Sequence, residues 1–100
     1  MPFNGLVEPS GFELTAGAAE VSAWQPEGGG RTKSFCRRCG GHVFGGDLDG
    51  DLPIAVRLGT VEGDPEIEPS RRAWVSSAPD WCEIPDDGLE RFPESRPKRL

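Results

Sequence analysis

The sequence predicts a mainly β fold made of small sheets of short antiparallel strands. Polar and apolar residues alternate over several short runs, which is the two-residue period of a half-buried strand. The chain's 14 glycines and 10 prolines lie largely between these runs and mark frequent turns. No segment keeps an apolar period of 3.6 residues over three helical turns, so we expect no long amphipathic helix.

Six segments show the pattern expected of strands. The clearest covers residues 54–58, where Ile54, Val56 and Leu58 share one face by the two-residue period. The three glycines Gly28–Gly30 predict the turn of a hairpin whose second strand leads into Cys36. The predicted strands are Phe12–Leu14, Val21–Gln25, Arg31–Phe35, His42–Phe44, Ile54–Leu58 and Arg72–Val75.

A chain of 100 residues is expected to form one domain with a modest core. We assign residues 1–93 to that domain and 94–100, with three basic residues, to a disordered tail. Apolar residues make up 35% of the chain, below the usual range. A small domain of this kind often needs a metal ion or a partner chain to complete its stability.

Charge and hydropathy exclude several classes of function. The net charge of −6 argues against a nucleic-acid binder or a protein held at an anionic membrane, because both need clustered Lys and Arg. No stretch is apolar and long enough to span a bilayer, and the first residues have no signal-peptide pattern. We therefore expect a cytoplasmic protein, in which three cysteines are metal ligands or free thiols sooner than disulfides.

The segment Cys36–Gly41, which we call the cysteine turn, carries the main chemical signal of the sequence. Cys36 and Cys39 are two residues apart after a predicted strand, a spacing at which both sulfurs can face one metal ion in a zinc knuckle. Gly40 and Gly41 allow the positive φ and close backbone approach that such a turn requires. We predict that these two cysteines bind Zn²⁺.

Two cysteines are half of a structural zinc site, which has four ligands in a tetrahedron. His42 is the one histidine of the sequence and Cys82 the one further cysteine. Three alternatives remain open at this point. The other ligands come from a second copy or a partner chain, or from His42 or Cys82, or the cysteine turn binds no metal and is able to form a disulfide. A thioredoxin-type redox motif is not expected, because no βαβ pattern surrounds it.

The order of landmarks along the chain resembles a known family. They are Gly11-Phe12, Gly17, Trp24, the segment Arg31–Gly40, Trp74 and Ala78–Trp81. Over about Gly11 to Pro93 this is similar to the carboxyl-terminal two-thirds of the glutathione-dependent formaldehyde-activating enzymes, a family that also includes centromere protein V. The resemblance implies β-sheets built around two zinc ions, a carbon–sulfur lyase class of activity, and a thiol such as glutathione as a partner molecule.

The resemblance also implies a role for each cysteine pair. Cys36 and Cys39 correspond to the second pair of a four-cysteine structural zinc site. The family's catalytic zinc is held by an earlier Cys-x-Cys-x-x-Cys motif, which this sequence does not contain. We therefore expect an amino-terminally truncated member, with no catalytic and no cofactor-binding residues beyond the metal ligands, that is inactive alone. The alternative is a non-enzymatic, zinc-dependent binding or assembly module, as a homodimer or with a partner chain.

Overall fold

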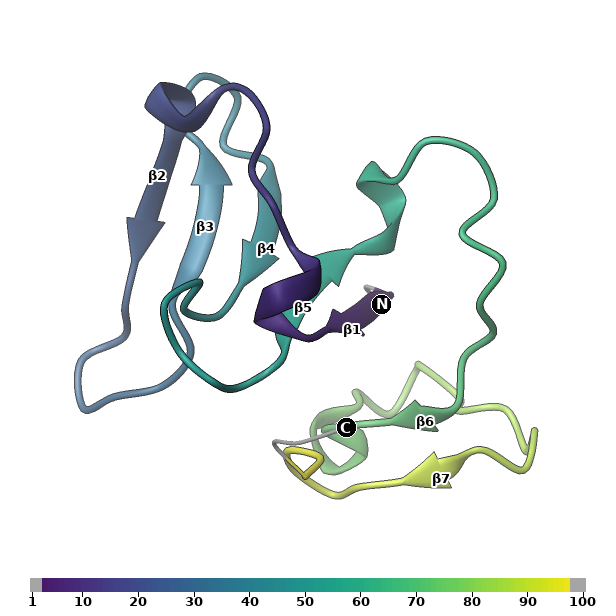
Figure 1. The fold of residues 1–100 in the computed structure, drawn as a ribbon. Coiled ribbons are helices and arrows are strands. Elements are labelled where there is room, and N and C mark those ends of the chain that lie inside the picture. The colour runs from purple at the N-terminus through teal and green to yellow at the C-terminus, as the bar shows by residue number, and fades with distance from the viewer. Residues whose placement is uncertain (1–2, 98–100) are drawn as a thin grey trace. The chain divides into compact units, whose positions relative to one another are not determined.

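The computed structural model describes residues 3–97, which form two compact units. The first unit comprises residues 3–65 and the second begins at Glu66 and continues to residue 97. Each unit has its own sheet, and Figure 1 shows the strands of both.

The first unit is built on a five-stranded antiparallel sheet with the strand order β1-β5-β4-β3-β2. Its strands are β1 (Asn4–Val7), β2 (Val21–Trp24), β3 (Lys33–Cys36), β4 (His42–Gly45) and β5 (Ile54–Arg57). Strands β2 to β5 follow one another as neighbours, while β1 pairs with β5 at the far edge. The prediction of a mainly β fold with a small antiparallel sheet is therefore confirmed.

The core of this unit is small and lies on one face of the sheet. Ser34 is paired with Phe44 and Phe44 with Val56, so their side chains share a face. Phe44 and Ile54 are buried, and the Phe12 ring packs on Phe44 with 5.0 Å between ring centroids. The short 3₁₀ helix Pro9–Gly11 follows β1, and the segment after this helix, which begins with Phe12, covers this face.

Arg31 fixes the end of the β4–β5 connection. Its Nη1 donates a hydrogen bond of 2.6 Å to the Pro53 carbonyl, and its side chain passes over Gly45 and Gly46. A Cβ added at Gly45 would lie 3.2 Å from Arg31 Cδ, and one at Gly46 would lie 3.1 Å from Ile54 Cδ1. A side chain at Gly45 would meet Arg31, and one at Gly46 would meet both Ile54 and Arg31, whose Nη1 would lie 3.2 Å from the added Cβ.

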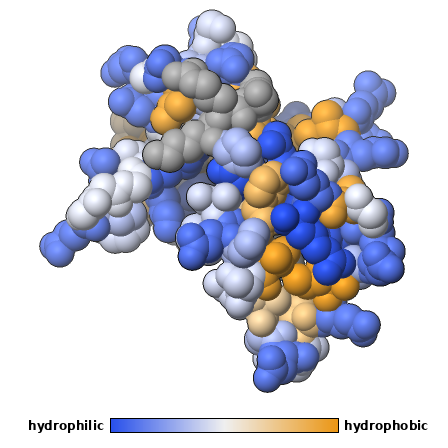
Figure 2. All heavy atoms as spheres, turned by 90° about the horizontal axis from the view of Figure 1, so that it is seen from below, coloured by the Kyte–Doolittle hydropathy of each residue, from blue (hydrophilic) through white to orange (hydrophobic). Residues whose placement is uncertain are grey.

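The second unit contains little regular structure. Strands β6 (Arg71–Arg72) and β7 (Glu90–Arg91) form a parallel pair, and Val75–Ser77 is a 3₁₀ helix. The amide of Trp74 donates to the Glu94 carbonyl at 2.8 Å, and that of Val75 to the Phe92 carbonyl at 3.1 Å. Figure 2 shows that, on the face it presents, apolar residues reach the surface in patches among hydrophilic ones.

Two of the predicted strands are wrong. Residues Phe12–Leu14 form no ladder, although Phe12 has extended backbone angles, because no strand lies beside them. Of the predicted strand Arg72–Val75 only Arg72 is in a strand, since Trp74 takes a left-handed conformation with φ of 59°. Strands β1 and β7 were not predicted, and the pairing of β6 with β7 is parallel instead of antiparallel.

The remaining four predicted strands are confirmed with shifted ends. The predicted Arg31–Phe35 strand begins at Lys33 and extends to Cys36, and the last predicted residue of Ile54–Leu58 starts a 3₁₀ helix, Leu58–Thr60. The predicted disorder of residues 94–100 falls partly on 98–100, which lie outside the described residues.

Over the described chain, no helix has the length and apolar character needed to cross a membrane.

Candidate metal centre

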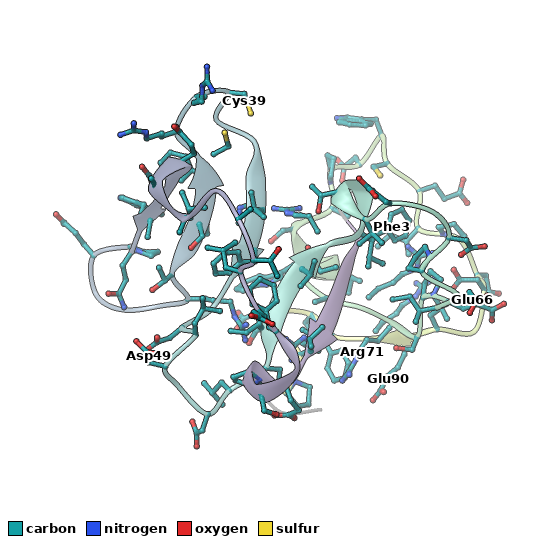
Figure 3. All side chains as sticks on the ribbon, turned by 45° about the horizontal axis from the view of Figure 1, so that its top comes forward. Phe3, Cys39, Asp49, Glu66, Arg71 and Glu90 are labelled. Carbon is teal, nitrogen blue, oxygen red and sulfur yellow. The ribbon has the colours of Figure 1, made fainter. Side chains whose placement is uncertain are left out.

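The cysteine turn joins β3 to β4 and is closed by backbone hydrogen bonds. The amide of Cys36 donates to the Gly41 carbonyl at 2.9 Å, and the amide of Gly40 donates to the Cys36 carbonyl at 2.7 Å. Gly40 has a φ of 78°, a left-handed conformation that favours glycine over residues with a Cβ. Gly40 thus has the positive φ predicted for the turn, whereas Gly41 does not, and Cys39 lies at the outer tip of the turn (Figure 3).

Backbone amides surround the two sulfur atoms. Hydrogen bonds from the Cys39 amide, then from the Arg38 amide and the Cys39 thiol, lower the pKa of Cys36 below its ordinary value. The Gly41 amide donates to Cys39 Sγ at 3.4 Å. Amides that stabilise a thiolate favour metal binding as well, because the thiolate and not the thiol is the ligand. The hydrogen bonds of the cysteine turn therefore favour the thiolate form of Cys36.

The arginines of the turn are exposed and leave the sulfurs accessible. Arg37 Nε pairs with Glu20 Oε2 at 3.0 Å, and the amide of Arg37 donates to the Glu20 carbonyl at 2.9 Å. This pairing ties the turn to the end of the 3₁₀ helix Ala18–Glu20, directly before β2. Cys39 is exposed and Cys36 half-buried, and neither is in a disulfide.

His42 is not placed as a third ligand beside the two sulfurs. Among residues 3–97, no group of three or more His, Cys, Asp or Glu side chains is placed so that it could hold a metal ion. His42 lies in β4, where burial, with Arg57 and then Lys33, lowers its pKa below 6.5. Cys82 belongs to the second unit and is a free thiol.

Sequence reasoning did not find the contact between Trp24 and Lys33. The Lys33 ammonium lies 5.5 Å from the centroid of the Trp24 ring, in a cation–π arrangement across the β2–β3 hairpin. The signal was present in the sequence, since a hairpin centred on Gly28–Gly29 places residues 24 and 33 opposite each other. Trp81, the aromatic residue with the largest exposed fraction at 86%, lies in the second unit.

The fold and the cysteine turn together define a small antiparallel β protein with a Cys-x-x-Cys turn between two neighbouring strands. The family model described as glutathione-dependent formaldehyde-activating enzyme matches residues 1–77, more than half of the chain. The chain belongs to this family. The match includes the five-stranded sheet and the cysteine turn, whereas residues 78–100 lie outside it. Searches of curated proteins and of solved structures found no match.

Proposed function

We propose that the chain binds Zn²⁺ through Cys36 and Cys39, as one half of a four-thiolate site. The observation that supports this most directly is the closed turn, in which the Gly41 amide donates to Cys39 Sγ and backbone hydrogen bonds join Cys36 to Gly40 and Gly41. The ordered turn removes part of the entropy cost of bringing two ligands to one ion. A zinc ion in this site would lie about 2.3 Å from each sulfur.

The missing ligands come from outside the described chain. A tetrahedral site needs four ligands, and the cysteine turn supplies two. Cys39 is exposed, so a second cysteine turn can approach the same ion from the solvent side. A homodimer with Cys36 and Cys39 from each chain is the simplest arrangement, and a partner chain with its own cysteine pair would serve equally.

At the level of the family, the activity is carbon–sulfur lyase chemistry on the adduct of formaldehyde with a thiol such as glutathione. An open catalytic zinc site requires three protein ligands and a free position. The sequence has three cysteines, of which two are in the cysteine turn and one in the second unit. We propose that this chain alone is inactive as a lyase and that its zinc site is structural.

The alternative is a non-enzymatic zinc-dependent binding or assembly module. It is favoured by the exposure of the cysteine turn at the tip of a hairpin, away from the small core. In that case zinc links this chain to another, and thiol compounds are not substrates. We expect the protein to act in the cytoplasm, where free thiols persist.

Zinc content and mass together test the proposal. Protein purified without chelator should contain zinc, and Cys36→Ser with Cys39→Ser should abolish it. Cys82→Ser is the matched control, since it removes one thiol of the second unit and should leave the zinc content unchanged. Light scattering should give a dimer that chelator converts to a monomer.

Each alternative has a distinct outcome in this experiment. A monomer with one zinc per chain would contradict the shared site. Undiminished zinc in the double variant would refute the assignment of both cysteines. Lyase turnover of the formaldehyde adduct of glutathione by the zinc-loaded chain would overturn the proposed inactivity and leave the zinc assignment intact.

A further inference from the structure

The face of the five-stranded sheet opposite Phe44 carries basic side chains. Lys33 is paired with Gly45 and Gly45 with Ala55, so these residues share a face, and Arg57 follows on it two residues later. We call this the basic face. It is the reverse of the face that holds Ser34, Phe44 and Val56, because successive residues of a strand alternate between faces.

The cations of the basic face have no carboxylate partners in the described part of the chain. The two ion pairs formed there are Arg37–Glu20 and Arg72–Asp87, neither of which includes Lys33 or Arg57. Arg57 Nε is buried without a hydrogen-bond partner among the described residues. The guanidinium thus keeps hydrogen-bonding capacity that this unit does not use. Lys33 and Arg57 therefore place two positive charges on one face of this sheet, in a chain whose net charge is −6.

Strand β2 is an edge strand of the sheet and pairs with β3, the strand that carries Lys33. Lys33 reaches toward it, since its ammonium lies 5.5 Å from the ring centroid of Trp24, which is 55% exposed. The hydrogen bond from the Arg37 amide to the Glu20 carbonyl shows that these two residues are a hydrogen-bonded pair at the end of the β2–β3 ladder. Hydrogen-bonded and non-hydrogen-bonded pairs alternate along an antiparallel ladder. By that alternation Ala23 is at a non-hydrogen-bonded position, so its N–H and C=O point outward along the free edge.

We propose that the β2 edge and the adjoining basic face bind an acidic peptide segment in extended conformation. The peptide adds to β2 as a further strand, with backbone hydrogen bonds to Ala23. Its carboxylate side chains lie on the face that Lys33 and Trp24 share, beside the Lys33 ammonium and the Trp24 ring. The opposite edge, β1, supplies no comparable attraction, because Asn4–Val7 contains no charged residue.

Shape and charge favour a peptide over other anions. A sheet face is open and flat, whereas small molecules are bound in concave sites that bury most of their surface. Addition of a strand to a free edge is an established mode of peptide recognition. A nucleic acid gains its affinity by neutralising many phosphates, which the two cations of the basic face on an acidic chain do not provide. The proposal does not depend on zinc at the cysteine turn.

Fluorescence anisotropy tests the proposal with the full chain and a labelled peptide of about six residues in which threonine and glutamate alternate. In such a strand all carboxylates point to one side. We expect saturable binding that weakens as salt is raised. Lys33→Gln should weaken it about fivefold and Trp24→Ala by a similar factor, with a smaller effect of Arg57→Gln because Arg57 lies farther from β2.

Two controls separate the basic face from net charge. Arg38→Gln removes the same single charge from the cysteine turn and should change affinity less than twofold. Arg57→Lys keeps the charge and should restore binding relative to Arg57→Gln. Amide chemical shifts should change in Val21–Trp24 and not in Asn4–Val7, and circular dichroism of each variant checks that it is folded.

Several results would overturn the inference. Equal binding of a peptide with glutamine in place of glutamate would show that charge is not recognised. An equal loss in Arg38→Gln and Lys33→Gln would show that net charge alone acts. Tighter binding of a single-stranded oligonucleotide with the same number of negative charges, lost in Lys33→Gln, would assign the basic face to nucleic acid instead.

Discussion

The two units of the chain are stabilised in different ways. In the first unit, hydrogen-bonded ladders connect five strands, and every buried residue in the described range belongs to it: Ser34, Phe44, Gly45, Pro53 and Ile54. In the second unit, the parallel strands are two residues each, and no described side chain reaches full burial. Fully buried apolar side chains are therefore confined, among the described residues, to the first unit.

Side-chain hydrogen bonds, both to the backbone and to another side chain, connect the segments of the second unit. Arg72 pairs with Asp87, Arg91 Nη2 donates to the Pro85 carbonyl at 2.7 Å, and Ser76 Oγ donates to the Pro93 carbonyl. Each such bond contributes about 1 kcal/mol in net terms, so the unit depends on many small contributions. The difference teaches that single substitutions should be severe in the first unit and mild in the second.

The largest effect is expected from the buried aromatic residue of the first unit. Phe44→Ala should destabilise the unit by about 3–5 kcal/mol, because it removes a buried ring that also packs on Phe12. Phe3→Ala is the matched control, since Phe3 is 58% exposed, and it should cost less than about 1 kcal/mol. Denaturant unfolding followed by the amide signals of each unit gives both values. A similar loss for the two variants would refute the small, single-faced core.

A smaller effect is expected where Arg31 crosses the end of the sheet. Gly46→Ala should cost about 1–3 kcal/mol, because the added methyl would meet Ile54 and Arg31 and because φ is 116° there. Gly59→Ala is the control: no atom lies within 4 Å of its added Cβ. It should be neutral or stabilise the unit by up to about 1 kcal/mol. Thermal unfolding of the two variants makes the comparison, and equal midpoints would show that Arg31 yields without cost.

The smallest effect is a difference in the pH at which each unit begins to lose stability. Burial, Arg57 and Lys33 lower the pKa of His42 below 6.5 in the folded state. The unfolded chain therefore binds the proton first, and the first unit loses stability as pH falls from 6.5 toward the lowered value. The hydrogen bond from Arg72, then the Leu89 amide, lowers the pKa of Asp87 below 3.8, so the corresponding loss in the second unit starts only below pH 3.8.

Amide hydrogen exchange of each unit between pH 7 and pH 3 measures these two windows. His42→Gln should remove the loss near pH 6 from the first unit alone, and Asp87→Asn should remove the loss below pH 3.8 from the second unit alone. A common window for both units, unchanged in either variant, would contradict the assignment of the two groups.

The elements that the sequence predicted are those whose signals are local. Strand β5 follows from the alternation of Ile54 and Val56, and the cysteine turn follows from the spacing of Cys36 and Cys39 with two glycines after them. Strand β1 contains Asn4 and Gly5, which are poor strand formers. It becomes a strand because β5 offers a free edge beside it. That pairing is long-range and leaves no local pattern.

The errors at Phe12 and Trp74 have physical causes of the same kind. Phe12 has the backbone angles of a strand but is held by its ring on Phe44 and not by a ladder. Trp74 is held in a left-handed conformation by bonds of the 74–76 amides to carbonyls of residues 92–94, which local propensity opposes for a bulky residue. The basic face was also beyond sequence reasoning, because it depends on the register of three strands.

The antiparallel register of β2 with β3 limits the two-fold symmetric dimers that the chain can form. Cys36 is opposite Val21, at the first residue of the edge strand. In a two-fold dimer with β2 paired antiparallel to its copy about Ser22, the outward-facing Val21 of one chain would pair with Ala23 of the other, so the two cysteine turns would point to opposite ends of the joined sheet. The two Cys36 residues would also be separated by three inter-strand spacings, roughly 14 Å, beyond the reach of one zinc ion. A continuous ten-stranded sheet and a shared metal are therefore mutually exclusive assemblies, and a zinc-bridged pair has its symmetry axis through the tips of the turns.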